Sequence, residues 1–95
     1  MASTKEYLTY VLDLLREVKG ISYKKMMGEY LLYKGDILFG GVYDDRFLIK
    51  ITKSPKLYGF SKQIPYPGGK LMLLVDSENA EVIKEIVEKL YTDLQ

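Results

Sequence analysis

Apolar residues recur with a helical period at both ends of this 95-residue chain and with a period of two between them. Near the start, Leu8, Val11 and Leu15 follow the spacing of three and four that predicts an amphipathic helix, which we expect to end at about Lys19. The same spacing returns in the last residues. The alternation between them is typical of strands separated by tight turns. This pattern predicts an α+β fold in the order α-β-β-β-loop-β-α, with both helices packed on the sheet.

Local signals mark where the two helices begin. Ser3 or Thr4 can cap the first helix, since Ser3 and Glu6 have the spacing of a capping box. Asp76 or Ser77 is the predicted cap of the second helix. The predicted buried stripe of that helix consists of Ile83, Ile86, Val87, Leu90 and Leu94.

Two tight turns organise the central strands. Residues 34–36 contain a glycine that suits a short hairpin turn between strands over 29–33 and 37–43. Asp44-Asp45 predicts a second turn, which leads into a strand over 46–52. We therefore expect an antiparallel sheet of four to five strands, in which Phe47 and Ile49 face the core.

The remaining central segments have mixed signals. Residues 53–69 contain three prolines and predict an irregular excursion with one short helical turn over 56–60. Residues 71–75 are apolar on both alternating faces, which predicts a strand that is covered on both sides.

Within the central strands, Gly40-Gly41 predicts a bulge or the close approach of another backbone, such as a tightly packed helix. We interpret Met26-Met27 as core filler, with an adaptable binding surface as the alternative.

The side-chain repertoire argues against catalysis. The chain has no cysteine and no histidine, so thiolate nucleophiles, imidazole bases and the commonest transition-metal ligands are missing. No phosphate-binding glycine motif is present. Asp44 and Asp45, with Asp36 and Glu29, are the only carboxylates that suggest a cation site, and we interpret them as turn residues. We expect a protein that is no enzyme and holds no metal or cofactor.

Charge is unevenly distributed along the chain. The formal net charge is +1, yet residues 21–70 carry nine lysines and arginines against four acids, and residues 71–95 carry two against six. Such asymmetry can steer a charged partner or pair two copies of the chain as a homodimer. Neither a signal peptide nor an apolar run long enough to span a membrane is found, so we expect a single cytoplasmic domain over 1–95.

Aromatic residues are interleaved with lysines in the irregular segment. Tyr58, Phe60 and Tyr66 lie among four lysines, a composition that could stack bases while neutralising phosphates. However, the pI of about 7.8 is below the strongly basic value typical of nucleic-acid domains. Weak direct nucleic-acid binding is therefore a minor alternative.

Several runs together resemble the N-terminal domain of TfoX/Sxy proteins. They are MGEYLLY at 27–33, LFG at 38–40, YDDRFLIK at 43–50 and PYPG at 65–68, and the resemblance extends over nearly the whole chain. It implies an α+β scaffold without catalytic residues and a role as co-regulator of a transcription factor in natural competence. Because full-length regulators continue into a second, helical domain, we expect a stand-alone N-terminal module. We interpret eight of the matching positions as structural, namely Met27, Gly28, Tyr30, Tyr33, Phe39, Gly40, Asp44 and Asp45.

Two functional hypotheses follow. The first is a protein-interaction module that uses either the wide apolar face of the first helix or a basic sheet face carrying Arg46 and Lys50. The second is a small-ligand or anion sensor, which requires Lys24 and Lys25 to converge with those two residues. Tyr66 is a further candidate contact, since exposed tyrosines often anchor interfaces.

Overall fold

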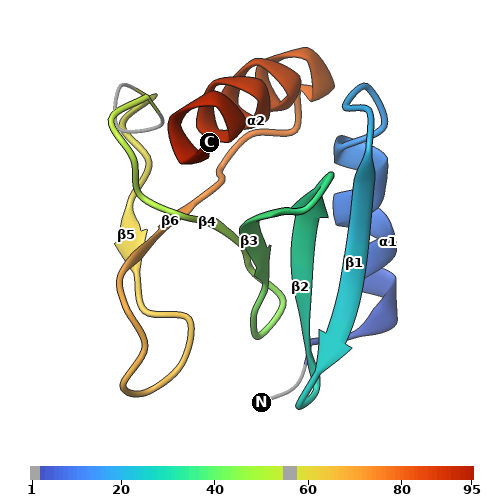
Figure 1. The fold of residues 1–95 in the computed structure, drawn as a ribbon. Coiled ribbons are helices and arrows are strands. Elements are labelled where there is room, and N and C mark those ends of the chain that lie inside the picture. The colour runs from blue at the N-terminus through green and yellow to red at the C-terminus, as the bar shows by residue number, and fades with distance from the viewer. Residues whose placement is uncertain (1–2, 55–57) are drawn as a thin grey trace.

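The computed structural model describes residues 3–54 and 58–95 and has the predicted α+β architecture, with two helices and one antiparallel sheet (Figure 1). Along the described chain the elements are α1 (Lys5–Leu14), β1 (Ile21–Met26), β2 (Glu29–Lys34), β3 (Ile37–Val42), β4 (Phe47–Ile49), β5 (Lys62–Gln63), β6 (Met72–Leu74) and α2 (Ala80–Leu94). Neither helix, over the described residues, is long and apolar enough to cross a membrane.

The sheet has the strand order β1-β2-β3-β4-β6-β5. Four strands, β1 to β4, follow one another as antiparallel neighbours, and β6 then pairs with β4 after the excursion that the sequence predicted. Six strands are found where four to five were expected, because residues 21–26 form a further strand, β1, and the excursion contributes the two-residue strand β5 at the edge. The expected helical turn over 56–60 lies partly outside the described residues.

The first helix is shorter than predicted. α1 ends at Leu14, and the chain then turns through residues 15–20, although Leu15 and Val18 are still buried. Buried apolar residues therefore continue beyond the end of the helix, because a buried turn also needs apolar side chains. Thr4, and not Ser3, is the N-cap, and its hydroxyl accepts a hydrogen bond from the Tyr7 N–H at 3.1 Å.

The predicted cap of the second helix is wrong by two to three residues. Asn79 caps α2, because its Oδ1 accepts hydrogen bonds from the N–H groups of Glu81 and Val82. Ser77 instead accepts a hydrogen bond from the Asn79 N–H, so it supports the cap from outside the helix. The predicted stripe is confirmed, since Ile83, Ile86, Val87 and Leu90 are buried and Leu94 packs against them.

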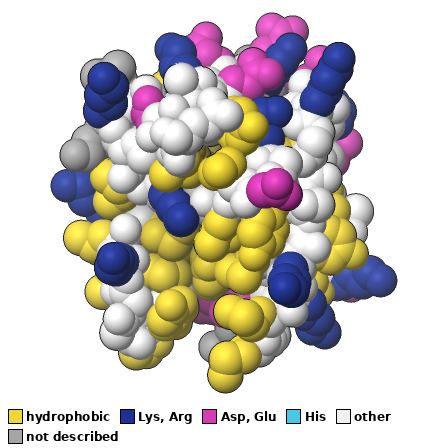
Figure 2. Space-filling view, viewed as in Figure 1, with side chains coloured by type: hydrophobic (Ala, Val, Ile, Leu, Met, Phe, Trp, Pro, Cys, Tyr) yellow, Lys and Arg dark blue, Asp and Glu magenta, His cyan; other side chains and the backbone are white. Residues whose placement is uncertain are grey.

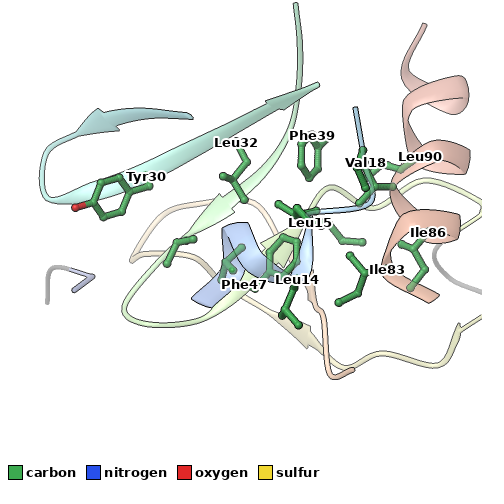
Figure 3. Close-up of a cluster of buried hydrophobic side chains, with 14 of the residues drawn as sticks. Leu14, Leu15, Val18, Tyr30, Leu32, Phe39, Phe47, Ile83, Ile86 and Leu90 are labelled. Atoms are coloured by element: carbon green, nitrogen blue, oxygen red, sulfur yellow. The ribbon is translucent and has the colours of Figure 1, made fainter. Parts of the chain in front are cut away.

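Both helices pack on the same face of the sheet and enclose one hydrophobic core (Figure 3). Phe47 and Ile49 point into this core, as the alternating pattern predicted. In Figure 1, β1 crosses in front of α1, so the view looks onto the sheet from the other side. We call that side the helix-free face. The labelled core residues in Figure 3 are Leu14, Leu15, Val18, Tyr30, Leu32, Phe39, Phe47, Ile83, Ile86 and Leu90.

The glycine pair of β3 lies where neighbouring strands approach most closely. A Cβ on Gly40 would lie 2.3 Å from the Leu48 carbonyl oxygen, and one on Gly41 would lie 2.5 Å from the Tyr30 oxygen. The pairing of β2 with β3 also shifts at Leu32/Tyr33, which confirms the predicted bulge. The approaching backbone belongs to β2 and β4, and not to a helix as the sequence suggested.

Candidate binding surface

The helix-free face is partly covered by the chain between β5 and β6. Arg46 holds this segment in place, because its guanidinium donates hydrogen bonds to Gln63 Oε1 at 2.8 Å and to the carbonyl oxygens of Ile64 and Pro65, both at 3.2 Å. The Nε of the same side chain donates to the Tyr43 carbonyl. Four donors in a planar fork make Arg46 a structural clamp. It is half-buried, and not the exposed contact residue that the sequence suggested.

Beyond the clamp, a tight turn presents Tyr66. The Gly69 N–H donates to the Tyr66 carbonyl at 2.9 Å, with Pro67 and Gly68 as the two central residues. Gly68 has a φ of 85°, and proline followed by a residue with positive φ defines a type II turn. The Tyr66 side chain is 55% exposed, with its ring centroid 6.1 Å from that of Tyr43.

The Tyr43 and Tyr66 rings separate two hollows on the helix-free face. The first, which we call the lysine groove, has a volume of about 590 Å³. Burial, and then the neighbouring Tyr66, raises the pKa of Tyr43 above its ordinary value. The lining of the lysine groove includes Leu38, Tyr43, Lys50, Tyr66, Lys70 and Met72.

The second hollow has a volume of about 550 Å³ and is predominantly apolar. We call it the methionine hollow. Its residues come from the hairpin of β1 and β2, from the end of β3 and from the tip of the 64–71 segment. They are Met26, Met27, Glu29, Leu31, Tyr43 and Tyr66.

Met27 stands out at the rim of the methionine hollow. The two-residue turn between β1 and β2 has positive φ at both positions, 52° at Met27 and 84° at Gly28, as in a type I′ turn. Asparagine and glycine prefer such positions, whereas a left-handed conformation at another residue costs about 1–2 kcal/mol. Nevertheless Met27 occupies it with a side chain that is 96% exposed. The interpretation of Met26-Met27 as core filler is therefore wrong.

The carboxylates near the second turn tie down the start of the chain. Asp45 Oδ1 accepts hydrogen bonds from the Thr4 backbone N–H at 2.8 Å and from the Thr4 hydroxyl. Glu29 Oε1 accepts from the Ser3 hydroxyl at 2.7 Å and from the Ser3 and Asp44 N–H groups. These acids therefore serve as hydrogen-bond acceptors for the chain. No group of three potential metal-ligating acids is found among the described residues.

The four cations predicted to converge are not brought together. Lys24 and Lys25 lie on β1 at one edge of the sheet, where successive side chains point to opposite faces. Lys50 follows β4, which is separated from β1 by two strands, and Arg46 is engaged in the clamp. Of the predicted contact residues, only Lys50 and Tyr66 line the lysine groove together. The anion-sensor hypothesis in its four-cation form has no geometric basis.

The proposed base-stacking aromatics are also dispersed. Tyr58 and Phe60 stack on each other with ring centroids 6.0 Å apart and pack against the core. The Tyr58 hydroxyl also donates a short hydrogen bond to Glu85 on α2, and this bond is the main cause that raises the pKa of Tyr58. Of the three aromatic residues, only Tyr66 is exposed. A continuous stacking platform is therefore missing from the described part of this segment.

Sequence reasoning did not single out Leu71, gave Lys70 only as one of the lysines among the aromatic residues, and gave Met27 a binding role only as the alternative to core filler. A residue-glycine pair between two alternating segments is a hairpin signal, and it could have placed Met27 at an exposed tip. No comparable local signal places Lys70 in the same groove as Lys50, because that placement depends on the path of the whole excursion.

No protein-family model matches this chain, and no curated protein matches its sequence. The resemblance to TfoX/Sxy proteins stays a prediction from the residues.

Proposed function

We propose that this protein is a non-enzymatic protein-interaction module of the TfoX/Sxy co-regulator type, which binds its partner through the helix-free face. The observation that carries the proposal is Met27, a large apolar residue held almost fully exposed in a backbone conformation that favours asparagine or glycine. Strained backbone at an exposed apolar side chain is characteristic of a position kept for binding, because folding alone gains nothing from it.

The distribution of exposed apolar side chains supports the same face. Among the described residues, the large apolar side chains that are at least half exposed lie either at the β1–β2 hairpin or in the 64–71 segment. Figure 2 shows hydrophobic side chains gathered over the middle and lower part of this side of the molecule, with lysines and arginines around them. A contiguous apolar patch with a polar rim is typical of a protein interface. These residues are Met26 (53%), Met27 (96%), Ile64 (50%), Tyr66 (55%) and Leu71 (51%).

Capture followed by titration tests the proposal. The immobilised domain is exposed to lysate of its own source cells, the captured protein is identified by mass spectrometry, and its affinity is then measured by calorimetry with purified components. Met27→Asn is expected to weaken binding about tenfold or more, because it removes an apolar contact of hot-spot size. The same variant places a preferred residue in the turn, so lost binding cannot be ascribed to misfolding.

Tyr10→Ser provides the matched control, since Tyr10 is a 41% exposed aromatic residue on α1, away from both hollows. It should leave the affinity unchanged. Equal binding by wild type and Met27→Asn, or loss of binding in Tyr10→Ser alone, would contradict the proposed surface. Failure of the wild-type domain to capture any protein would contradict the interaction function itself.

A small-ligand or anion-binding function is the second candidate, and the lysine groove favours it. Lys50 lies in this groove with Lys70 and the Tyr66 ring, and the volume is within the range of small-molecule sites. Thermal melting with simple carboxylates and phosphates tests this alternative. A midpoint that rises with ligand concentration in the wild type, but not in Lys50→Gln, would support it.

A further inference from the structure

The lysine groove carries a charge imbalance. Neither Lys50 nor Lys70 forms an ion pair with a described residue, and no described residue that lines the groove carries a carboxylate. Lys50 is half-buried, so a partner that covers the groove would remove much of its remaining water. An ammonium that loses water without gaining an acceptor costs several kcal/mol. Whatever covers this groove therefore has to bring hydrogen-bond acceptors, and carboxylates meet this need best because they also neutralise the charge.

The methionine hollow has the opposite preference. It is lined by Met26, Met27 and Leu31, and the one carboxylate in its lining, Glu29, already accepts hydrogen bonds from Ser3 through Oε1. A second anion beside Glu29 would be repelled, whereas a large apolar side chain would bury against the thioethers. The two hollows therefore select different chemistry.

Both hollows share the Tyr43 and Tyr66 rings as lining residues, so they adjoin along one line across the face. A single extended segment that crosses this ring pair can enter both hollows. Tyr66 is fixed for such a role, because the Arg46 clamp and the type II turn hold its backbone in place. Such a segment has to carry its acidic part and its apolar part in a set order, because the lysine groove prefers the first and the methionine hollow the second.

A second copy of the chain does not meet these requirements well. Four of its thirteen acidic residues lie on α2, which packs on the opposite face of the sheet, and Figure 2 shows acidic side chains gathered at the top, where Figure 1 places α2. A contact between the groove of one copy and the α2 surface of the next would join unlike surfaces. Such contacts build open chains of copies unless the rotation closes a ring. The acidic residues on α2 are Glu81, Glu85, Glu88 and Asp93.

We infer that the partner presents an extended segment with two parts: a cluster of carboxylates that binds the lysine groove and, a few residues away, large apolar side chains that bind the methionine hollow. This inference rests on the proposed function and specifies the chemistry of its partner. The charge pairs steer and orient the segment, and the apolar contacts provide most of the affinity.

Selection from a random peptide library displayed on phage tests the inference even while the partner is unidentified. The wild-type domain is expected to enrich peptides in which aspartate or glutamate stands at a set distance from large apolar residues. Lys50→Glu with Lys70→Glu should bind a selected peptide at least about tenfold more weakly, and high salt should have little effect on what binding remains. Replacing the acids of the peptide by amides should reduce wild-type affinity similarly and have little effect on the double variant.

Lys19→Glu with Lys84→Glu makes the same change in net charge on exposed lysines outside both hollows and should bind like the wild type. Circular dichroism checks folding, and Lys50→Gln with Lys70→Gln provides a milder variant if the charge reversal unfolds the domain. Three results would each overturn the inference. They are selected peptides without acidic enrichment, failure to select any peptide, and undiminished binding by both the glutamate and the glutamine double variants of Lys50 and Lys70. If no peptide is selected but the fatty-acid anion decanoate binds the lysine groove, the groove would be assigned to small anions instead. If the captured protein requires Met27 but is indifferent to Lys50 and Lys70, the proposed function stands and this inference fails.

Discussion

At the scale of single residues, Met27 in the β1–β2 turn lowers the stability of the fold, whereas under the proposed function it serves binding. Met27 adopts a φ of 52° with its side chain in solvent, so the folded state gains little apolar burial from it. Asparagine tolerates this conformation much better, because its short polar side chain hydrogen-bonds locally. We therefore propose that Met27, which costs stability and protrudes from an apolar hollow, is retained for the partner that it binds.

Replacing Met27 by asparagine is accordingly expected to stabilise the domain, by about 0.5–1 kcal/mol, because the Asn-Gly pair is strongly preferred in type I′ turns. Urea denaturation followed by circular dichroism measures the difference. Met26→Asn is the matched control, since Met26 lies in regular β1, where asparagine is disfavoured, and this variant should not be stabilised. A less stable Met27→Asn variant would show that the exposed thioether supports the fold.

At the scale of elements, the segment between β5 and β6 depends on one arginine. Arg46→Lys keeps the charge but cannot span Gln63, Ile64 and Pro65, because a single ammonium lacks the planar fork. We expect a loss of about 1–2 kcal/mol in stability and faster amide hydrogen exchange in peptides covering 60–72, with little change in α1.

Hydrogen exchange read by mass spectrometry measures this effect directly. Arg16→Lys serves as the control, since Arg16 is an exposed residue that pairs only with Asp13 among the described residues, and it should be nearly neutral. Unchanged exchange over 60–72 in Arg46→Lys would mean that the segment is held by its own turn and by Pro65.

A second tether joins the segment after β4 to α2. Asp93 accepts hydrogen bonds from the Thr52 hydroxyl at 2.7 Å and from the Ser54 N–H at 3.2 Å, and these bonds lower its pKa. A carboxyl whose pKa is lower in the folded state contributes stability above its unfolded pKa of about 4, and the contribution disappears as pH falls through the folded value. Asp93 is therefore one source of acid sensitivity in this fold.

Asp93→Asn should be less stable than the wild type at pH 7, and the difference should shrink as the pH falls from about 5 to about 2. Denaturation midpoints across this range measure it. Asp36→Asn makes the same charge change in an exposed turn and serves as the control. A difference between Asp93→Asn and wild type that is constant with pH would exclude a titrating tether.

The elements also show where sequence reasoning succeeds. The period of two over 46–52 correctly placed Phe47 and Ile49 in the core, because pairing alternates the two faces of a strand. The end of α1 was missed because buried apolar residues continue into the turn that follows it, and the cap of α2 was missed because Ser77 and Asn79 are both residues that can cap a helix.

At the scale of the whole molecule, the candidate surface could be predicted only in part. Lys50 and Tyr66 were identified from charge and composition, yet their shared groove arises from a chain excursion that has no regular period. Periodicity specifies which face a residue occupies within one element. It does not specify how an irregular segment folds back over a sheet, so the partners of Lys50 were found only in three dimensions.

Under the proposed function, the two faces of the sheet have different roles. The helices and the core occupy one face, and the two hollows with Met27, Tyr66, Lys50 and Lys70 occupy the other. Amide chemical-shift mapping of the nitrogen-15-labelled domain, titrated with the captured partner, tests this division most directly. We predict the largest changes at residues 26–31, 43, 50 and 64–72, with small changes along α1 and α2. Changes confined to the helices, with the helix-free face unaffected, would contradict it.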